Sequence, residues 1–439
     1  MVRFAVAFLF LSLALISSPA PAGQMTLALP AKADPAPRPF MGWSSWSSMR
    51  GNISESAIKA QARVMAAKLK QFGYIYVNID ANWSLGFDKY GRPKPNLRRF
   101  PDGIVGMASW LHARGLKLGI YLVPGLSRAV YQANDRIRGT RYTVRQIADP
   151  LRNGNTLGSA FCHINYNRPG ERAYIQSWAN LLARWGVDYI KLDFVGPGGG
   201  YRGFRRTDNR ADVAQWATAL KRAGRPVWLE LSNSLAMQDA GYWKRYANGW
   251  RIDGDIEAYH TAFLTSWNRV RTRFSAVPLW DRFAGPGGWN DLDSLEIGNG
   301  NRDGLTLDER KSVMTFWCIS GSPLCLGANL TNLTPEDINI ITNRSLIAID
   351  QSGRVAVPLS QSSLHQVWLI RNAGSYIVAV FNLGHSPTKI NLTWISFGFS
   401  GRADVTDIWT HRPLGRFSHG FTFNLRPHAS RLLRVTPSR

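Results

Sequence analysis

The stretch DYIKLDFVGPGGG at residues 188–200 has the pattern of a buried strand that ends in a glycine-rich turn. Its apolar positions are Tyr189, Ile190, Leu192 and Phe194. Side chains two positions apart in a strand point to the same face, so Lys191 and Asp193 should share one face. A buried carboxylate is costly unless it is paired or hydrogen-bonded. We therefore expect Asp193 to have a specific role at the end of this strand.

Similar apolar segments recur along the chain and are separated by helical patterns. The segments expected to form strands are 40–46, 74–81, 117–125, 188–194, 226–233, 248–255, 285–295 and 323–330. The helical patterns cover 55–72, 103–115, 173–186, 210–223, 239–246, 261–273 and 308–319, and Ser54 is placed to cap the first of them. An irregular insertion rich in Asn, Gly and Arg is expected at 127–170. The alternation predicts an α/β fold, a parallel (β/α)8 barrel of the TIM type over residues 40–353.

The pattern changes near Arg354. From there on, short alternating segments such as HQVWLIRN (365–372), SYIVAVFNLG (375–384) and RLLRVT (431–436) are joined by turns. Period-two alternation with turn residues is typical of antiparallel strands. We therefore expect a small C-terminal antiparallel β-sandwich domain at 354–439.

The first 22 residues have the features of an export signal. Arg3 supplies a positive charge, residues 4–16 form an apolar run, and APA at 20–22 resembles a cleavage site with small residues. The apolar run is too short to predict a membrane-spanning helix. The segment 23–39, rich in Ala and Pro, is expected to be a flexible lead-in. We predict a secreted or periplasmic protein without stable membrane insertion.

Composition sets further bounds. The chain has 439 residues and 45% hydrophobic content, enough for one large and one smaller domain. Its net charge is +24, but the basic residues are scattered, which favours a soluble basic surface and no nucleic-acid partner. The cysteines Cys162, Cys318 and Cys325 lack the spacing of zinc ligands, so we expect buried free thiols.

Polar and aromatic residues stand at the expected carboxyl ends of the strands, where parallel barrels place their reactive side chains. A single acid there usually caps a helix or braces a loop. Here five of the eight expected strands bring at least one carboxylate to the same rim, which favours a functional cluster. In strand order the residues are Trp46, Asp80, Tyr121, Asp193, Glu230 with Asn233, Asp255, and Asp291 with Asp293.

The motifs of several other chemistries are absent from the sequence. There is no GxGxxG after the first strand, no P-loop, no HExxH and no serine elbow. We therefore expect no cofactor and no metal. Clustered carboxylates with Trp46 and Tyr121, which can stack on sugar rings, fit glycoside hydrolysis, because that reaction needs two carboxyl groups. The expected partner is an oligosaccharide or polysaccharide substrate.

In several motifs the chain resembles glycoside hydrolase family 27, the α-galactosidase or melibiase family, from about residue 40 to near its C-terminus. The matching motifs are MGWSSW (41–46), GYIYVNIDANW (73–83), RFPDGI (99–104), GLKLGIY (115–121), WGVDYIKLDF (185–194), GWRIDGDI (249–256) and GPGGWNDLDSLEIGN (285–299). The resemblance implies a βα barrel followed by a C-terminal antiparallel β domain, as the patterns above predict.

The resemblance also implies roles for the acids. Asp193, in YIKLD, matches the family's catalytic nucleophile. Asp255, in an RxxxD element that begins at Arg251, matches the acid/base, and this spacing favours it over Asp253. A retaining double-displacement mechanism follows from these roles. The implied substrate-binding residues are Trp46, Asp80, Tyr121, Lys191, Arg251 and Asp293, with Glu230 in a strand segment that departs from the family pattern.

Three departures bear on the substrate. Ala81 stands where the family usually has a second Asp that recognises the region of the galactose 4- and 6-hydroxyls. The segment LELSNS (229–234) also differs, so Glu230, Ser232 or Asn233 could line the 2-hydroxyl subsite. The family's disulfide after the nucleophile is missing, since Phe194 and Val195 follow Asp193.

The first hypothesis is a secreted retaining exo-glycoside hydrolase, an α-galactosidase that releases terminal α-galactosyl residues. Because hydrogen bonds to hydroxyls decide between epimers, the loss of an acid at Ala81 keeps two alternatives open. These are isomalto-dextranase and β-L-arabinopyranosidase activities of the same family. A noncatalytic carbohydrate-binding protein is the alternative from another class.

Overall fold

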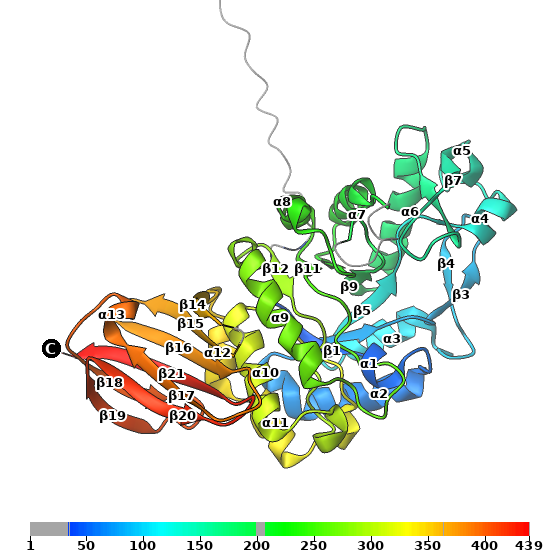
Figure 1. The fold of residues 1–439 in the computed structure, drawn as a ribbon. Coiled ribbons are helices and arrows are strands. Elements are labelled where there is room, and N and C mark those ends of the chain that lie inside the picture. The colour runs from blue at the N-terminus through cyan, green and yellow to red at the C-terminus, as the bar shows by residue number, and fades with distance from the viewer. Residues whose placement is uncertain (1–33, 35, 199–206, 363, 439) are drawn as a thin grey trace, which may run out of the picture. The chain divides into compact units, whose positions relative to one another are not determined.

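The computed structural model describes residues 34, 36–198, 207–362 and 364–438. It contains an eight-stranded parallel, TIM-like barrel and a C-terminal antiparallel β sandwich, which confirms the predicted fold class (Figure 1). The predicted export signal at 1–22 lies outside the described residues, as does most of the lead-in at 23–39. None of the helices in the described part of the chain combines the length and the hydropathy of a membrane-spanning segment.

All eight predicted barrel strands are present, although each is shorter than its apolar pattern. They are β1 (Met41–Ser44), β2 (Tyr76–Ile79), β5 (Lys117–Leu122), β9 (Val187–Leu192), β10 (Trp228–Leu231), β11 (Gly249–Arg251), β12 (Trp289–Asp291) and β13 (Leu324–Leu326). Their hydrogen-bonded order is β12-β11-β10-β9-β5-β2-β1-β13, and every pairing is parallel. The two ends of this order meet through a parallel bridge between Leu295, which follows β12, and Leu326 of β13.

The helices around the barrel also follow the sequence, with one clear shift. They are α1 (Trp46–Met49), α2 (Glu55–Val64), α3 (Gly103–His112), α6 (Glu171–Arg184), α7 (Arg210–Arg222), α8 (Ala240–Tyr246), α9 (Trp267–Trp280), α10 (Leu307–Ser320), α11 (Pro335–Ile341) and α12 (Arg344–Asp350). Ser54 caps α2 as predicted, since its Oγ accepts a hydrogen bond from the backbone N–H of Ala57 at 3.2 Å. The helix expected at 261–273 is wrong in position, because residues 255–266 form a loop and α9 starts only at Trp267.

Shorter helical turns complete the barrel domain. After α2 the chain continues through a π-helical segment, η1 (Met65–Leu69), and a 3-10 turn, η2 (Lys70–Phe72), so the helical stretch predicted to reach Phe72 does so. Further 3-10 turns are η4 (Met237–Asp239), η5 (Asp281–Phe283), η6 (Gly300–Asp303) and η7 (Leu330–Asn332). A hairpin of β3 (Ser84–Phe87) and β4 (Pro93–Pro95) follows β2 and was not predicted.

The insertion at 127–170 is more regular than predicted. It contains β6 (Leu126–Ser127), α4 (Arg128–Ala133), α5 (Val144–Ile147), β7 (Ala148–Asn153) and β8 (Phe161–Ile164). The strands form a small antiparallel sheet in the order β6-β8-β7. Within the insertion, Val130, Ile137, Val144, Ile147 and Cys162 are fully or almost fully buried. These apolar side chains give the insertion a core, and their irregular spacing concealed it in the sequence.

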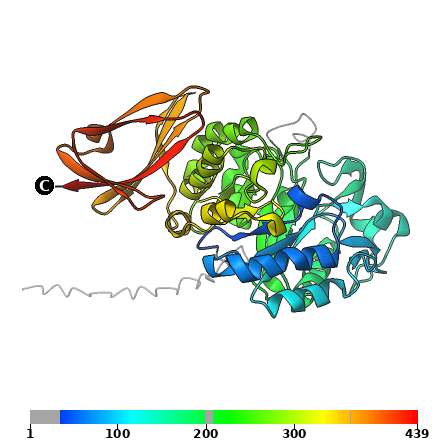
Figure 2. The same ribbon diagram turned by 90° about the horizontal axis from the view of Figure 1, so that it is seen from below.

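The C-terminal sandwich consists of short antiparallel strands (Figure 2). They are β14 (Val357–Gln361), β15 (His365–Asn372), β16 (Ser375–Asn382), β17 (Thr388–Thr393), β18 (Arg402–Asp407), β19 (Pro413–Ser418), β20 (Gly420–Leu425) and β21 (Ser430–Ser438), with a helical turn α13 (Trp394–Phe397). Six strands form one sheet in the order β14-β15-β16-β21-β18-β19, and β17 pairs with β20. The core between the two sheets includes Trp394, Val378 and Leu433.

Aromatic side chains join this domain to the barrel. Phe274 of α9 stacks on Phe316 of α10 with ring centroids 3.8 Å apart, and both contact Phe381 of β16. Trp267, the first residue of α9, stacks on His428 before β21 at 4.8 Å. Ser312 of α10 donates a hydrogen bond to the carbonyl oxygen of His428 at 2.7 Å. These contacts are part of one continuous hydrophobic core that extends from the barrel into the sandwich.

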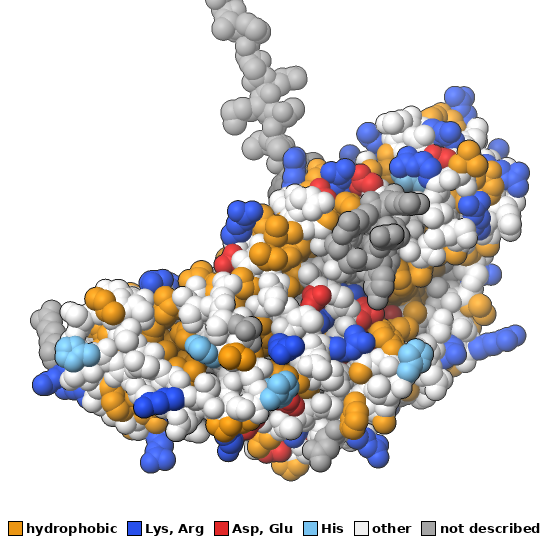
Figure 3. Space-filling view, viewed as in Figure 1, with side chains coloured by type: hydrophobic (Ala, Val, Ile, Leu, Met, Phe, Trp, Pro, Cys, Tyr) orange, Lys and Arg blue, Asp and Glu red, His pale blue; other side chains and the backbone are white. Residues whose placement is uncertain are grey.

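The distribution of charged side chains and the state of the cysteines match the expectations from composition. Lys and Arg side chains are spread over the face shown in Figure 3, with acidic side chains between them. Cys162, Cys318 and Cys325 are buried free thiols, as predicted.

Candidate active site

A cavity of about 950 Å³ opens at the carboxyl ends of the barrel strands. Parallel barrels hold their functional side chains at this end. The residues around the cavity are Trp46, Asp80, Ala81, Tyr121, Lys191, Asp193, Phe194, Asn233, Ser234, Arg251, Asp253, Gly254, Asp255, Tyr259, Ser266, Asn268, Arg269, Thr272 and Arg273.

Asp193 and Lys191 share one face of β9, as the alternation of the opening stretch predicts. The Lys191 ammonium donates to Asp80 Oδ2 at 2.9 Å and lies 3.9 Å from Asp193 Oδ2. Burial alone would lower the pKa of Lys191, but the carboxylates of Asp80 and Asp193 raise this pKa well above its ordinary value. Lys191 is therefore a fixed positive charge between two carboxylates.

The backbone after β9 holds the Asp193 carboxylate in place. Phe194 has a left-handed conformation with φ 56°, which turns the chain sharply after the strand. Its N–H donates to Asp193 Oδ1 at 2.8 Å. One carboxylate oxygen of Asp193 is thus fixed by the backbone, while the other faces Lys191 in the cavity.

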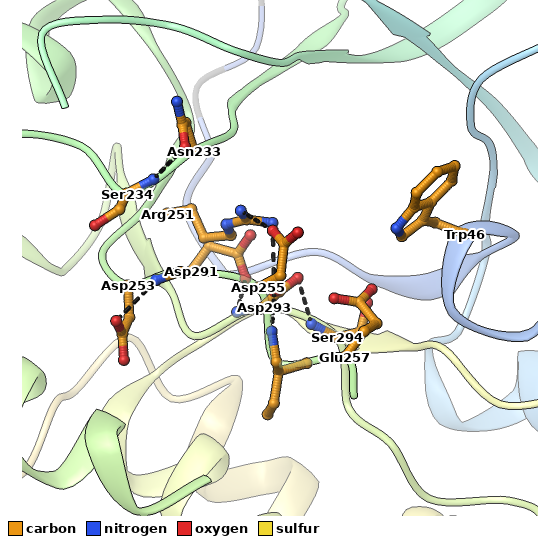
Figure 4. A network of polar contacts seen from close by, with 12 residues as sticks. Trp46, Asn233, Ser234, Arg251, Asp253, Asp255, Glu257, Asp291, Asp293 and Ser294 are labelled. Carbon is orange, nitrogen blue, oxygen red and sulfur yellow. Dashed lines mark hydrogen bonds and ion pairs between the residues drawn. The ribbon is translucent and has the colours of Figure 1, made fainter. Parts of the chain in front are cut away.

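Asp255 lies on the loop after β11 and accepts hydrogen bonds at both carboxylate oxygens. Arg251 donates to Oδ1 (Figure 4). The Tyr259 hydroxyl donates to Oδ2 at 2.7 Å. Arg269 of α9 donates to the Asp255 carbonyl oxygen at 3.0 Å. Burial raises the pKa of Asp255, but Arg251 and the Tyr259 hydrogen bond outweigh it and lower the pKa to about 2.

Tyr259 was not identified from the sequence. It links Asp255 to the opposite wall, because its hydroxyl accepts a hydrogen bond from Trp46 Nε1 at 3.0 Å. The guanidinium of Arg50 lies over the Tyr259 ring at 4.6 Å from its centroid. Tyr259 lies in the loop before α9 rather than at a strand end, so neither the strand pattern nor a motif indicated it.

Tyr121 and Asp80 form the wall opposite β11. The pKa of the Tyr121 hydroxyl is raised by burial and by the carboxylates of Asp193 and Asp80. Asp80 accepts a hydrogen bond from the N–H of Ala81 at its Oδ1, 2.8 Å away, and its own N–H donates to Ser45. Ala81 also lines the cavity.

Two predicted binding residues do not line this cavity. Glu230 is 2% exposed, and its Oε2 accepts a hydrogen bond from Trp228 Nε1 at 2.8 Å. Asp293 accepts a hydrogen bond from the N–H of Ile256 at 2.8 Å and lies 3.3 Å from Arg251. Both border a small space of about 30 Å³ inside the barrel, and so does Asp291.

The enclosed position of Glu230 follows from the reach and the partner of its side chain. It pairs in register with Lys191 of β9, whose longer side chain does reach the cavity. Glu230 lies within β10, whereas Asn233 follows its end and does line the cavity. Burial and the neighbouring Asp291 raise the pKa of Glu230 well above its ordinary value, which fits a group enclosed by the barrel.

Arg273 of α9 holds the loop that carries Asp255, and sequence reasoning missed it. Its guanidinium donates to the carbonyl oxygens of Gly254 at 2.5 Å and of Leu292 at 3.3 Å. It also lies 3.4 Å from Asp253 Oδ2. Arg273 is the last residue of the helical pattern expected at 261–273, and nothing in that pattern indicated its contacts with backbone carbonyl groups.

One group of carboxylates has the spacing of a cation site. Atoms of Asp255, Glu257 and Asp293 lie within 4.8 Å of one another. Arg251 already contacts the first and third of these carboxylates, and Ser47 donates to Glu257 at 2.8 Å. Burial and the charge of Asp293 raise the pKa of Glu257 to about 7. The arginine therefore supplies the positive charge that a metal ion would bring.

Comparisons with known proteins agree with this fold. The chain matches the family described as "Alpha galactosidase A" over residues 38–132 and 154–352. It matches "Alpha galactosidase C-terminal beta sandwich domain" over residues 362–435. The gap at 133–153 falls within the insertion between β6 and β8.

Individual relatives cover nearly the whole chain. Alpha-galactosidase 3 of Arabidopsis thaliana is 30% identical over 411 residues, which are 91% of this chain and 82% of the relative. The crystal structure of a family 27 β-L-arabinopyranosidase from Geobacillus stearothermophilus is similar with a TM-score of 0.84 and 28% identity, covering 92% of this chain and 97% of that one. α-Galactosidase I from Mortierella vinacea has a TM-score of 0.71 and 27% identity, covering 92% and 99%. The chain belongs to the α-galactosidase family of glycoside hydrolases, family 27.

Proposed function

We propose that this glycoside hydrolase is a retaining exo-α-galactosidase that releases terminal α-galactosyl residues outside the cytoplasm. The observation that carries the proposal is a pair of carboxylates facing one cavity with different surroundings. Asp193 lies beside the Lys191 ammonium, and Asp255 is held by Arg251 and Tyr259. Retaining glycosidases use such a pair as nucleophile and acid/base.

In the first step, Asp193 is the nucleophile. One of its carboxylate oxygens forms a bond to the anomeric carbon while the bond from that carbon to the leaving oxygen breaks. The electrons of the broken bond go to the leaving oxygen, which takes the proton of the Asp255 carboxylic acid and departs as an alcohol. The Lys191 ammonium, 3.9 Å from Asp193, balances the charge of the nucleophile before the attack.

In the second step, Asp255 acts as the base. Its carboxylate takes a proton from a water molecule whose oxygen bonds to the anomeric carbon. The ester bond to Asp193 breaks, and its electrons return to the carboxylate. The anomeric configuration is retained because the configuration inverts twice.

The cavity wall supplies the groups that would hold the sugar ring. Trp46 provides an aromatic surface, on which the apolar face of a galactosyl ring can pack. Asp80 and Arg251 bring an acceptor and donors for ring hydroxyls, and Lys191 and Tyr121 line the same cavity. The surroundings thus suit a single polar ring next to Asp193.

Ala81 favours a second candidate, a β-L-arabinopyranosidase. A β-L-arabinopyranoside has the ring geometry of an α-galactoside but lacks the hydroxymethyl group at C5. A pocket with a methyl group at this position makes no side-chain hydrogen bond to that region, so it loses less with the smaller sugar. The similar structure from Geobacillus stearothermophilus bears the name of that activity.

Turnover of the purified protein on three substrates tests the proposal. These are nitrophenyl α-galactoside, nitrophenyl β-L-arabinopyranoside and dextran. Preferred hydrolysis of the α-galactoside supports the first candidate, and preferred hydrolysis of the arabinopyranoside replaces it with the second. Release of isomaltose from dextran alone would refute both and indicate an isomalto-dextranase.

Two variants test the mechanism on the best substrate. Asp193→Asn, which keeps the size of the side chain, should abolish hydrolysis while the protein stays folded. Asp255→Ala should slow substrates with poor leaving groups most, because a good leaving group needs little protonation. Equal binding of sugar by wild type and Asp193→Asn, without turnover by either, would instead indicate a noncatalytic binding protein.

Export is tested separately. Cell fractionation and mass spectrometry of the N-terminus should find the mature protein outside the cytoplasm, beginning near residue 23. Recovery of intact chains starting at Met1 in the cytoplasm would contradict it.

A further inference from the structure

Tyr259 connects the two sides of the cavity. Trp46 Nε1 donates to the Tyr259 hydroxyl at 3.0 Å, and that hydroxyl donates to Asp255 Oδ2 at 2.7 Å. The indole has one N–H and the tyrosine one O–H, so the direction of both bonds is fixed. The chain of donors ends on the carboxylate proposed as the acid/base.

The position of the Tyr259 side chain is further restricted by Arg50. The Arg50 guanidinium lies 4.6 Å from the centroid of the Tyr259 ring and 5.6 Å from that of Trp46. A cation over two aromatic rings favours this arrangement of both. The hydroxyl of Tyr259 is therefore held at Asp255 from the side opposite Arg251.

Charged groups from several elements face Asp255. They are Arg251 of β11, Lys191 of β9, Arg269 of α9, Asp293 after β12, and Glu257 on the same loop. Their effect is mixed, since three are cationic and two are acidic. Among them, Arg251 occupies Oδ1, so the other oxygen is the one that must carry the proton when Asp255 acts as an acid.

That oxygen is the one bonded to Tyr259. The ionised Oδ2 accepts this bond as a charge-assisted hydrogen bond, which is stronger than a bond between neutral groups. A protonated Oδ2 still accepts from the Tyr259 hydroxyl but more weakly, so the bond favours the ionised carboxylate.

We infer that Tyr259 is a positioning residue that orients the Asp255 carboxylate and favours its ionised form, the form that takes a proton from water in the second step. This role rests on the proposed function of Asp255. Through Tyr259, the loop between β11 and α9 would thus influence the relative rates of the first step, which needs protonated Asp255, and the second step, which needs ionised Asp255. Tyr259 itself transfers no proton to the substrate in this proposal.

Tyr259→Phe removes the hydroxyl and keeps the ring under Arg50. We expect the midpoint of the Asp255 titration to move up by about one pH unit, because a hydrogen bond to a charged group is lost. The measurement is ¹³C NMR of protein labelled at aspartate carboxyl carbons, with Asp255→Asn identifying the signal. Tyr242→Phe is the matched control, since that hydroxyl donates to the Arg210 carbonyl oxygen at 2.9 Å, outside the cavity wall.

Kinetics give a second readout on the substrate that the protein hydrolyses best. With a poor leaving group, the fall of kcat/KM at high pH should move up by about one pH unit in Tyr259→Phe, because the acid form persists longer. With an activated aryl glycoside, whose second step limits turnover, kcat should fall several-fold at neutral pH, because the carboxylate, ionised in both proteins, loses the hydrogen bond that orients it. A merely structural role would lower both rates without moving the pH profile.

The outcomes separate the two proposals. An unmoved Asp255 titration in folded Tyr259→Phe overturns the role of Tyr259. A shifted titration in a protein that hydrolyses no glycoside overturns the proposed function but supports the positioning role. If Tyr259→Phe does not fold, Trp46→Phe decides by NMR: loss of the indole donor should shift Asp255 in the same direction by a smaller amount, and no shift overturns the inference.

Discussion

Replacing Arg273 by methionine tests how the loop before Asp255 is held. Arg273 is 2% exposed and makes four hydrogen bonds, to the carbonyl oxygens of Gly254, Leu292 and Arg269 and to the Thr272 hydroxyl. Methionine fills similar space without any donor, so the carbonyl groups of Gly254 and Leu292 lose their partner in a buried region.

The size of the effect follows from these contacts. Four hydrogen bonds at a net value of about 1 kcal/mol each give about 4 kcal/mol. The loss of one partner of a buried ion pair independently suggests about 3–5 kcal/mol, here reduced by the partial exposure of Asp253. We therefore expect Arg273→Met to lower the free energy of unfolding by about 3–4 kcal/mol.

Urea unfolding at pH 7, followed by circular dichroism and by tryptophan fluorescence, measures this value. Arg271→Met is the matched control, because Arg271 lies on the same helix but is exposed, and its loss should change stability by less than about 0.5 kcal/mol. A loss below about 1 kcal/mol for Arg273→Met would refute the reasoning. It would mean that water or a rearranged loop replaces the arginine at no cost.

Three further perturbations probe other features. Ala81→Asp should raise the ratio of kcat/KM for the α-galactoside over the β-L-arabinopyranoside by about tenfold or more, since it adds one charge-assisted hydrogen bond; an unchanged ratio in a substrate comparison would argue against this position as the determinant. Phe316→Ala should destabilise the protein by about 3–5 kcal/mol in urea, with the exposed Ile395→Ala as control. Glu257→Gln should weaken the pH dependence of stability. In the wild type, the folded protein keeps the Glu257 proton up to about pH 7, whereas the unfolded chain loses it near pH 4.5. The stability of the wild type should therefore fall as the pH rises through this range. Melting temperatures at pH 4.5, 6 and 7.5 check the last point, and parallel curves for the two proteins would contradict it.

The barrel could be predicted because the residue composition of each strand segment agrees with the structure that the segment forms. Segments such as 74–81 and 188–194 combine β-branched and apolar residues, and most of the strand segments are separated by helical patterns. Ser54 shows the same consistency at the level of one residue, since a serine before a helical pattern is a preferred N-cap. Local rules therefore sufficed for the order and type of the main elements.

Errors arose where long-range contacts override local pattern. The helix expected from residue 261 begins at Trp267, because the preceding loop carries Tyr259 to the cavity. The strand pattern gives the face of Glu230 but not how far its side chain is enclosed, and in the structure this side chain is 2% exposed. Arg273 acts through backbone carbonyl groups, which leave no trace in the sequence.

The helix α9 has a consequence for how this protein can be divided. Its arginine clamps the loop of the proposed acid/base, while Phe274 on the same helix packs against Phe316 and Phe381. Its first residue, Trp267, stacks on His428 of the sandwich. A truncated protein that ends after α12 would lose the contacts of α9 with Phe381 and His428, and α9 holds the loop of the proposed acid/base. We therefore expect the sandwich to stabilise this loop, so that the barrel alone is not equivalent to the barrel in the whole protein.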